Sequence, residues 1–584
     1  MNSGEMTTRG RAMMLVLLAV ISASGVFDHS LWSGNDTREG AMIREMARER
    51  VWVTPVFNGV HYLEKPPLLH WTGVVFCRLA GTASEGLVRL PAALYAFLTL
   101  LIIVLWGHSL GREQAGFAAA FMCATSVLFF EYARIVLTDS CLTFMVVFSL
   151  WLFWRAQVAE DNLVRRYLLF MFAAAFSFYA KGLIGPGMIW LSVAAWLLIQ
   201  RRFRLLFLLV PAFAVMFAAV LAPWVLALWK AGGLEFLRGV FWENQFGRFL
   251  YFNDPGLPVD PYLIHKEPVY FYLFSLPVRL LPWTLLVVPA LYYWFRRESP
   301  VRGDLAAFLK TSLLAMAFLL HISSAKAACY VLPLFPLLFL MTAVWMEDAA
   351  AEWRSALDRR LIGATFIAMG ALVLCAPAVY LLAFMFRMPL VSQPCLPSAW
   401  VCFLVALVAL AAGWLLERTT WKAFREGRRR AAVLAMPAIL AVVGIVGASV
   451  FIPAVDFHRS YVPFAGLLRE EMNAGRRVIF PSDSERDLGA FMFYLDARLE
   501  TAALSKPNEA LSFLGDRDRP LGIVVPASDL IRVASRLGGR PFGVKKADGC
   551  GKKSESFRLI TIEPENAKHA PRGRGSPARK RPSG

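Results

Sequence analysis

Long apolar blocks alternate with short polar segments along most of this chain. Blocks such as 97–106, 145–154 and 431–450 consist almost entirely of apolar residues. With their flanks they reach the roughly 20 residues that a helix needs to cross about 30 Å of hydrocarbon. The pattern therefore predicts an all-α polytopic membrane protein. Thirteen transmembrane helices are expected, at 12–27, 88–108, 114–131, 141–157, 166–181, 184–200, 205–230, 269–295, 306–322, 328–346, 360–386, 399–416 and 431–452.

The polar segments on the two sides of these spans differ in charge. If the N-terminus is cytoplasmic, every inner loop is short and basic, as the positive-inside rule requires. One miscounted span would break this alternation, so the agreement supports the count. The inner loops are 107–113, 155–166, 201–204, 296–305, 347–360 and 417–430. We therefore expect a multi-pass membrane protein with a cytoplasmic N-terminus and a C-terminal domain on the outer side.

The first apolar block, 12–27, follows Arg9 and Arg11 and has small residues near its end. A cleaved signal peptide and an uncleaved anchor both show this pattern. Because more spans follow and the next loop carries candidate functional residues, we interpret the block as an uncleaved signal anchor.

The chain divides into three parts by composition. Residues 1–452 form the transmembrane module, and its first outer loop, 28–86, is unusually long and mixed in charge. Residues 453–565 are more polar, and short apolar runs alternate there with helical patterns, which predicts a small outer α/β domain. The strand-like runs are 478–480 and 521–525, and the helix-like ones are 465–474 and 527–537. The basic, Pro- and Gly-rich end, 566–584, is expected to be a disordered tail.

Composition and charge agree with this organisation. The chain is 58% hydrophobic, above the roughly 45–50% of soluble domains. The net charge of +19 first suggests nucleic acid as a partner. Most Lys and Arg, however, lie in short loops between apolar blocks, which is typical of membrane topology, so the lipid bilayer is the expected partner and nucleic acid is not. The eight cysteines show no CxxC or other metal spacing. Six lie in or near apolar segments and are interpreted as buried apolar residues, whereas Cys395 and Cys550 are loop or domain candidates.

Two outer carboxylates are candidate catalytic groups. Asp36 lies in the first outer loop beside Arg38, and Asp139 begins an apolar span after a short outer loop. A solvated loop with salt bridges would also explain the first, and a helix N-cap the second. Ionisable groups at membrane depth are costly, however, and for that reason are candidates for function.

Cations also lie at outer junctions, where the positive-inside rule disfavours them. They are Lys181, Arg248 and Lys326. Each could place its charge at the membrane interface while its stem stays in hydrocarbon. Alternatively, they converge on a lipid phosphate, since cations stabilise a leaving phosphate as its charge develops.

The ordered set of motifs over residues 28–340 resembles the GT-C class of polytopic lipid-linked glycosyltransferases. The similarity is to the aminoarabinose (lipid A) transferase branch and its protein O-mannosyltransferase relatives. Beyond residue 340 the resemblance is only architectural. The residues that carry it are Trp32, Asp36-Thr37-Arg38, Arg44-Glu45-Met46, Trp52-Val53-Thr54-Pro55, Asn58-Gly59, Glu64-Lys65-Pro66-Pro67-Leu68-Leu69, Ala133-Arg134, Asp139, Ala180-Lys181-Gly182, Asn244, Arg248, His265, Pro268, Leu281-Pro282-Trp283-Thr284, Lys326, Tyr330, Leu332-Pro333 and Pro336.

This resemblance implies transfer of a sugar from a polyprenyl-phosphate donor, with inversion, at the outer face of the membrane. The acceptor would be lipid A, a protein or another glycan. Asp36 and Asp139 would be the catalytic carboxylates. The donor phosphate would be held by Lys65, Lys181, Arg248, Lys326 and Tyr330, and the supporting residues would be Arg38, Glu39 and Arg134.

The chain departs from the family pattern at the first motif. The branch usually has Asp-Glu-Thr-Arg there, whereas this chain has Asn35-Asp36-Thr37-Arg38. The usual catalytic carboxylate thus aligns with Asn35. Either Asp36 assumes its role, or Asp28 does, or the activity is altered.

No cofactor is required by this reaction. The resemblance also implies that a divalent metal can bind near Glu64 and His265, but two ligands are too few to define a metal site.

Two other functions fit parts of the pattern. One is a transporter or flippase of lipid-linked sugars, and the other is a non-catalytic assembly protein whose outer domain is the working part. No internal repeat is detected, which weakens the transporter hypothesis. The charged residues gather on one side and the motifs occur in family order, so transfer is the favoured interpretation.

Overall fold

The computed structural model describes residues 6–32, 34–247, 267–323, 326–352, 356–385, 428–503, 519–537, 541–547 and 552–564, with single positions between 407 and 426. The chain forms two compact units, Met1–Asp456 and Phe457–Gly584.

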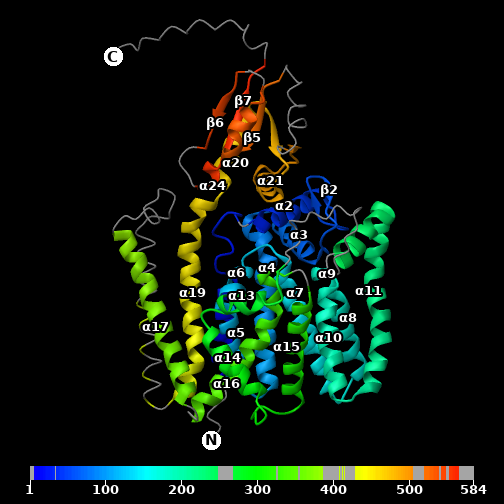
Figure 1. Ribbon diagram of the computed structural model, residues 1–584, viewed down its shortest axis with the longest axis vertical. Coiled ribbons are helices and arrows are strands. Elements are labelled where there is room, and N and C mark those ends of the chain that lie inside the picture. Colours follow the sequence, from blue (N-terminus) through cyan, green and yellow to red (C-terminus); the bar gives the residue numbers. More distant parts are fainter. Residues whose placement is uncertain are drawn as a thin grey trace. The chain divides into compact units, whose positions relative to one another are not determined.

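The first unit is a bundle of helices with a folded segment at one end (Figure 1). Its elements are α1 (Thr8–Ala23), α2 (Gly34–Glu49), β1 (Val56–Phe57), β2 (Val60–His61), α3 (Leu68–Ala80), α4 (Glu85–Ser109), α5 (Glu113–Thr125), α6 (Val127–Tyr132), α7 (Thr138–Gln157), α8 (Leu163–Phe176), α9 (Phe178–Lys181), α10 (Ile184–Ile199), α11 (Phe203–Leu237), the π-helix η1 (Arg238–Gly247), α13 (Phe271–Arg279), α14 (Thr284–Phe295), α15 (Asp304–Ile322), the 3-10 helix η3 (Ala328–Leu334), α16 (Phe335–Glu352), α17 (Ala356–Met385) and α19 (Arg429–Arg459).

Seven helical stretches among the described residues are long and apolar enough to cross a membrane, or eight if one bent pair counts as a crossing. They are Glu85–Ser109, Thr138–Gln157, Leu163–Lys181, Phe203–Gln245, Asp304–Ile322, Ala328–Ala351 and Ala432–Ser449, and the bent pair is Phe271–Arg279 with Thr284–Phe295. Together with the apolar outer surface described below, they make the chain a multi-pass membrane protein.

The predicted span 360–386 falls on the 30-residue helix α17. Other predicted spans differ from the set above in length or straightness. The predicted span 114–131 is two short helices, because the backbone at Ser126 is extended and ends α5. The predicted span 269–295 is two helices bent by 116°. Segments 12–27 and 184–200 correspond to helices of only 16 residues, α1 and α10. The predicted span 399–416 lies largely outside the described residues.

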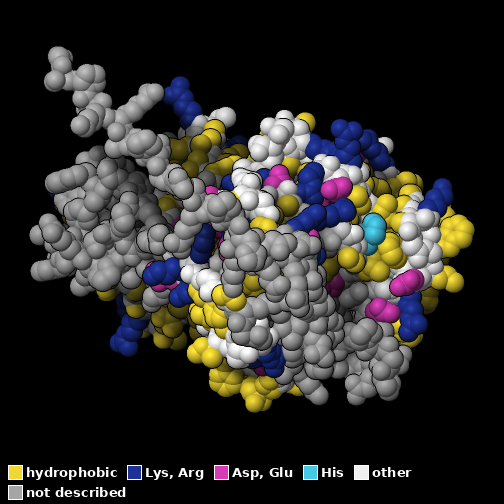
Figure 2. Space-filling view, turned by 90° about the horizontal axis from the view of Figure 1, so that it is seen from above, with side chains coloured by type: hydrophobic (Ala, Val, Ile, Leu, Met, Phe, Trp, Pro, Cys, Tyr) yellow, Lys and Arg dark blue, Asp and Glu magenta, His cyan; other side chains and the backbone are white. Residues whose placement is uncertain are grey.

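Apolar side chains cover the outside of the bundle where a bilayer would contact it. On α11, Phe207 is 75% exposed and Val215 is 71% exposed. Hydrophobic side chains are also visible at the edge of the face shown in Figure 2. Apolar surface of this extent is unfavourable in water, so these side chains are suited to contact lipid.

The segment predicted as the first outer loop forms a folded layer at one end of the bundle, here called the outer layer, built from α2, a β-hairpin and α3 (Figure 1). The hairpin turns at Asn58 and Gly59, whose φ angles are 53° and 83°. Positive φ at both positions is what a type I′ turn needs, and Asn-Gly is its preferred sequence. The Gly59 backbone N–H donates to Oε1 of Glu45 at 2.9 Å, which ties the hairpin tip to α2.

Arg89 anchors the start of this layer to α4. Its side chain is fully buried. It donates to Asp36 Oδ2 at 2.8 Å and to the carbonyl oxygens of His29 at 2.8 Å and Ser30 at 2.6 Å. The other carboxylate oxygen of Asp36, Oδ1, accepts from the backbone N–H of Val136 at 2.8 Å. One carboxylate therefore joins the first outer layer, α4 and the segment that leads into α7.

Arg134 makes a comparable anchor at the carboxyl end of α1. Its guanidinium donates to the carbonyl oxygens of Ser24 at 2.7 Å and Ile21 at 2.5 Å. It also lies over the ring of Phe130, 3.5 Å from the centroid. The last carbonyls of a helix have no partner within the helix and carry partial negative charge, so a buried cation stabilises this end.

The turn between α9 and α10 depends on glycine. Gly182 has φ 77° and ψ −151°, a region that side-chain-bearing residues rarely adopt. Gln245 of η1 packs directly against it, and its Oε1 accepts from the Leu183 N–H at 2.9 Å. A Cβ at position 182 would lie only 1.8 Å from that oxygen.

The second unit has a five-stranded sheet in the order β4-β3-β5-β7-β6. β3 pairs in parallel with β4 and β5, whereas β7 runs antiparallel to both β5 and β6. The predicted strands 478–480 and 521–525 fall on β3 and β5. Its elements are α20 (Val462–Asn473), β3 (Arg477–Pro481), α21 (Glu485–Leu495), β4 (Glu500–Ala502), β5 (Leu521–Pro526), the 3-10 helix η5 (Ala527–Asp529), α23 (Leu530–Ala534), β6 (Gly543–Lys545), α24 (Lys552–Glu555) and β7 (Phe557–Ile562).

The Arg89–Asp36 pair predicts a large effect on stability. Arg89→Met leaves the Asp36 carboxylate buried without its cation, and breaking a buried pair in this way costs about 3–5 kcal/mol. We expect a clearly lower Tm for the full chain in detergent. Asp36→Asn added to Arg89→Met removes the unpaired charge and should recover part of the loss. Wild-type Tm in the single variant would contradict the anchoring role.

Gly182→Ala is expected to lower the Tm as well, because it combines backbone strain of about 1–3 kcal/mol with a clash against Gln245. Gly187→Ala is the matched control. A Cβ there would meet Leu319 Cδ2 at 3.7 Å, an ordinary contact. Equal Tm values for the two variants would show that the turn tolerates a side chain.

Candidate functional site

The first lysine–carboxylate pair of the site joins α2 to the start of α3. Glu39 is fully buried, and its Oε1 accepts from Lys65 Nζ at 2.8 Å. Arg38 Nη2 donates to the same oxygen at 3.0 Å. The other oxygen, Oε2, lies 2.8 Å from Nε2 of His70, which is also fully buried. Lys65 retains 14% of its side-chain exposure, so its ammonium remains within reach of a ligand.

These partners keep Glu39 ionised. Burial raises the pKa of its carboxyl, but the charge of Lys65, the hydrogen bond from His70 and the charge of Arg38 outweigh burial. The pKa of Glu39 therefore lies well below its usual range. A carboxylate of this kind is a poor general base near neutral pH, whereas it holds cations firmly.

The second pair lies at the start of α7. Lys181 Nζ donates to Asp139 Oδ1 at 2.7 Å, and Asp139 is almost completely buried. The same ammonium lies 4.4 Å from the centroid of the Tyr330 ring, within the range of a cation–π contact. Three separate elements, α7, α9 and η3, thus meet around one ammonium group.

The π-helix η1 links the surroundings of the two pairs. Asn244 Nδ2 donates to the carbonyl of Leu63, two residues before Lys65, at 3.4 Å. The next residue, Gln245, binds the backbone of Leu183 at 2.9 Å, two residues after Lys181. The segments that carry the two lysines therefore contact consecutive residues of one helix.

Of the other residues predicted to bind the phosphate, the structure describes Lys326 and Tyr330 but not Arg248. Lys326 is 3% exposed and donates to the carbonyl of Ser323. Arg248, predicted for the phosphate, and His265, predicted for a metal, lie outside the described residues.

The second predicted metal ligand, Glu64, accepts a hydrogen bond from the Tyr62 hydroxyl. The Arg38 guanidinium lies 5.3 Å from the centroid of the Tyr62 ring. Over the ranges that the structure describes, no group of three or more His, Cys, Asp or Glu is arranged to hold a metal ion.

The structure places the alternative carboxylates of the first motif as follows. Both oxygens of Asp36 are engaged, by Arg89 and by the Val136 N–H. Asp28 lies 3.1 Å from the ring of His29 and is partly exposed. Asn35 stands at the usual acidic position and is partly buried.

Three residues of the site were missed by the sequence analysis. Arg89 lies inside the predicted span 88–108, and a charge in an apolar block is a signal that could have identified it. His70 follows Lys65 at the start of an apolar helix, where a polar residue is similarly informative. No local signal marks Gln245, whose role depends on packing against Gly182.

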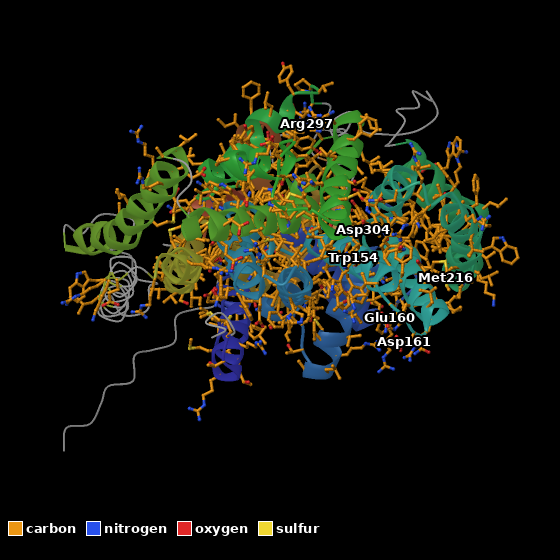
Figure 3. All side chains as sticks on the ribbon, turned by 90° about the horizontal axis from the view of Figure 1, so that it is seen from below. Trp154, Glu160, Asp161, Met216, Arg297 and Asp304 are labelled. Atoms are coloured by element: carbon orange, nitrogen blue, oxygen red, sulfur yellow. The ribbon has the colours of Figure 1, made fainter. Side chains whose placement is uncertain are left out.

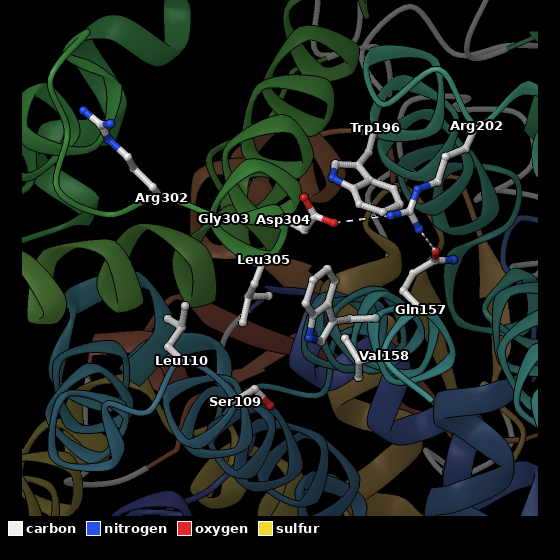
Figure 4. Close-up of a pocket in the computed structure, with 11 residues that line it drawn as sticks. Ser109, Leu110, Gln157, Val158, Trp196, Arg202, Arg302, Gly303, Asp304 and Leu305 are labelled. Atoms are coloured by element: carbon white, nitrogen blue, oxygen red, sulfur yellow. Dashed lines mark hydrogen bonds and ion pairs between the residues drawn. The ribbon is translucent and has the colours of Figure 1, made fainter. Parts of the chain in front are cut away.

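A cavity of about 400 Å³ lies elsewhere in the first unit. The residues that line it include Trp154 and Asp304, which are labelled in the view from below in Figure 3. Within this lining, Arg202 contacts Gln157 and Asp304 (Figure 4). Neither lysine of the two pairs lines this cavity. We therefore do not assign it to the donor.

Comparison with known protein families gives one match in the first half of the chain. The family model for dolichyl-phosphate-mannose-protein mannosyltransferases matches residues 64–227. This range includes Lys65, Asp139 and Lys181.

Two curated relatives illustrate the similarity. The undecaprenyl phosphate-alpha-4-amino-4-deoxy-L-arabinose arabinosyl transferase of Edwardsiella ictaluri is 28% identical over 345 residues, which is 58% of this chain and 59% of that protein. The protein of the same name from Pectobacterium carotovorum is 28% identical over 423 residues, 70% of this chain and 72% of that protein. The match to the first thus spans less than two thirds of the relative.

Solved structures share the fold over nearly the whole chain. ArnT from Cupriavidus metallidurans bound to undecaprenyl phosphate superimposes with a TM-score of 0.72 at 18% identity, covering 95% of this chain and 98% of that chain. The Archaeoglobus fulgidus oligosaccharyltransferase gives a TM-score of 0.50 at 11% identity, covering 93% and 74%. The family match, the relatives and the shared fold together show that the chain is similar to GT-C glycosyltransferases of the aminoarabinose-transferase type.

Proposed function

We propose that the chain transfers a sugar from a polyprenyl-phosphate donor to an acceptor at the outer face of a bacterial inner membrane. The observation that carries this proposal is the pair of buried carboxylate–ammonium contacts, Glu39–Lys65 and Asp139–Lys181, at 2.8 and 2.7 Å. The curated relatives are named for an undecaprenyl phosphate-linked aminoarabinose, so we propose a donor of that class. Their names are those of transferases, which favours transfer over flipping.

Lysine suits the leaving group of such a reaction. When the sugar–oxygen bond breaks, the electron pair stays on the phosphate, whose negative charge grows in the transition state. Preorganised cations stabilise that charge without reorganising at the moment of reaction. Lys65 and Lys181 each have three N–H donors and share one with a carboxylate. In the donor-free site, the carboxylates neutralise ammonium groups that would otherwise be buried unpaired.

The acceptor side of the reaction is assigned to Asp139. Its carboxylate would orient the acceptor and, for a hydroxyl acceptor, take the proton as the new bond forms. A phosphate acceptor needs less help from a base, and positioning then dominates. We propose that Asp36 acts on this step from a distance, since its bond to the Val136 N–H positions the segment that ends in Asp139.

The remaining features of the proposal follow from the resemblance and from topology. Lipid A is the proposed acceptor, and a protein or another glycan is the alternative. Mass spectrometry of the modified product distinguishes these acceptors. Direct displacement by the acceptor would invert the anomeric carbon. We propose a cytoplasmic N-terminus and a periplasmic second unit, as the distribution of basic loops indicates.

Asp139→Asn tests the proposal. The amide cannot accept the proton and no longer pairs with Lys181 as an anion, so we expect transfer to fall about 100-fold or more. The readout is mass spectrometry of lipid A and envelope glycoproteins from cells with and without the gene, at equal protein abundance. Asp161→Asn is the control, because that carboxylate is exposed and contacts its neighbours Asn162 and Arg166. Wild-type product levels with Asp139→Asn would remove Asp139 from the mechanism.

A further inference from the structure

The two oxygens of Glu39 are divided unequally among its partners. Oε1 is shared by Arg38 and Lys65, at 3.0 and 2.8 Å. Oε2 contacts Nε2 of His70 at 2.8 Å. A carboxylate rotates as a rigid plane, so the donor on Oε2 sets the direction in which Oε1 points. The direction of Oε1 in turn sets where the Lys65 ammonium rests.

The protonation of His70 follows from its partner. An ionised carboxylate only accepts hydrogen bonds, so Nε2 must carry the proton. Nδ1 is buried and has no hydrogen-bond partner in the part of the chain that is described. In the neutral ring this nitrogen is a bare lone pair, which costs less to bury than an unpaired N–H. His70 is therefore committed to a single polar contact, the one with Glu39.

Packing prevents this contact from relaxing easily. His70 lies in the first turn of α3, and Gly73, one turn later, packs against Ile43 of α2. A Cβ at Gly73 would lie 2.7 Å from Ile43 Cδ1. The close approach fixes the distance between the two helices, so the imidazole meets Glu39 in a defined geometry.

We propose that His70 is a positioning residue for the donor phosphate, acting through Glu39 on Lys65. The inference rests on the proposed function, in which Lys65 binds the phosphate. His70 itself need not contact the donor. It orients the carboxylate so that Lys65 Nζ is held by one hydrogen bond with its other two donors free to point away from Glu39.

Two substitutions separate a directed hydrogen bond from simple bulk. His70→Gln places an amide N–H near the position of Nε2, whereas the shorter His70→Asn reaches only the position of Nδ1. The probe is undecaprenyl phosphate, added to the full chain in detergent, with the Kd measured by native mass spectrometry. We expect His70→Asn to raise the Kd about tenfold, the effect of losing one hydrogen bond to a charged group. His70→Gln should stay within about threefold of wild type.

A double variant and a control test whether His70 affects donor binding through Lys65. Lys65→Gln should raise the Kd, and adding His70→Asn should raise it no further, because His70 acts only through that lysine. His29→Ala removes another histidine–carboxylate contact of the outer layer, between His29 Nδ1 and Asp28 at 3.1 Å, and should leave the Kd unchanged.

The outcomes test the role of Lys65 and the role of His70 separately. An unchanged Kd in Lys65→Gln would overturn the assignment of Lys65 to the donor phosphate. A raised Kd in Lys65→Gln with an unchanged Kd in His70→Asn would overturn the role of His70 alone. Equal losses in His70→Asn and His70→Gln, or additive losses with Lys65→Gln, would show that His70 contributes only to packing.

Discussion

A carboxylate removed from water must find a cation or strong hydrogen-bond donors, and α2 carries three such groups on one short helix. Asp36 binds Arg89 of α4 and the backbone of Val136. Glu39 binds Lys65 and His70, and Glu45 binds the hairpin tip. Each carboxylate therefore ties α2 to a different part of the first unit. The need to pair these buried charges holds this long loop in a folded layer.

The same constraint shapes the proposed donor site. Lys65 and Lys181 each rest against a buried carboxylate, so neither ammonium is buried without a counter-charge. Isolated charges there would be costly, whereas a paired ammonium keeps its charge and two further donors. A phosphate that approaches meets cations already held in place. This arrangement is consistent with a reaction that depends on stabilising a departing phosphate.

Asp36 and Glu39 share the outer layer but have different partners. Asp36 contacts an arginine and a backbone N–H, both of which belong to the scaffold. Glu39 contacts a lysine that keeps partial exposure. With Asn35 at the position where the family usually has its acid, the carboxylate that most directly adjoins an accessible lysine in this layer is Glu39. The sequence alone ranks Asp36 first, because it directly follows Asn35, the position of the usual acid.

The sequence by itself determined that the chain is polytopic, since hydropathy is a local property and the apolar blocks read directly as membrane helices. Their precise lengths were less predictable, because breaks such as the one at Ser126 depend on what packs around them. The sequence also identified Asp139 and Lys181 as candidates, since charges near apolar blocks stand out, whereas Lys65 became a candidate only through the family resemblance. Only the tertiary structure decided that Lys65 pairs with Glu39, 26 positions away, and Lys181 with Asp139, 42 positions away. Pairing across such separations is set by helix packing, and no local pattern encodes it.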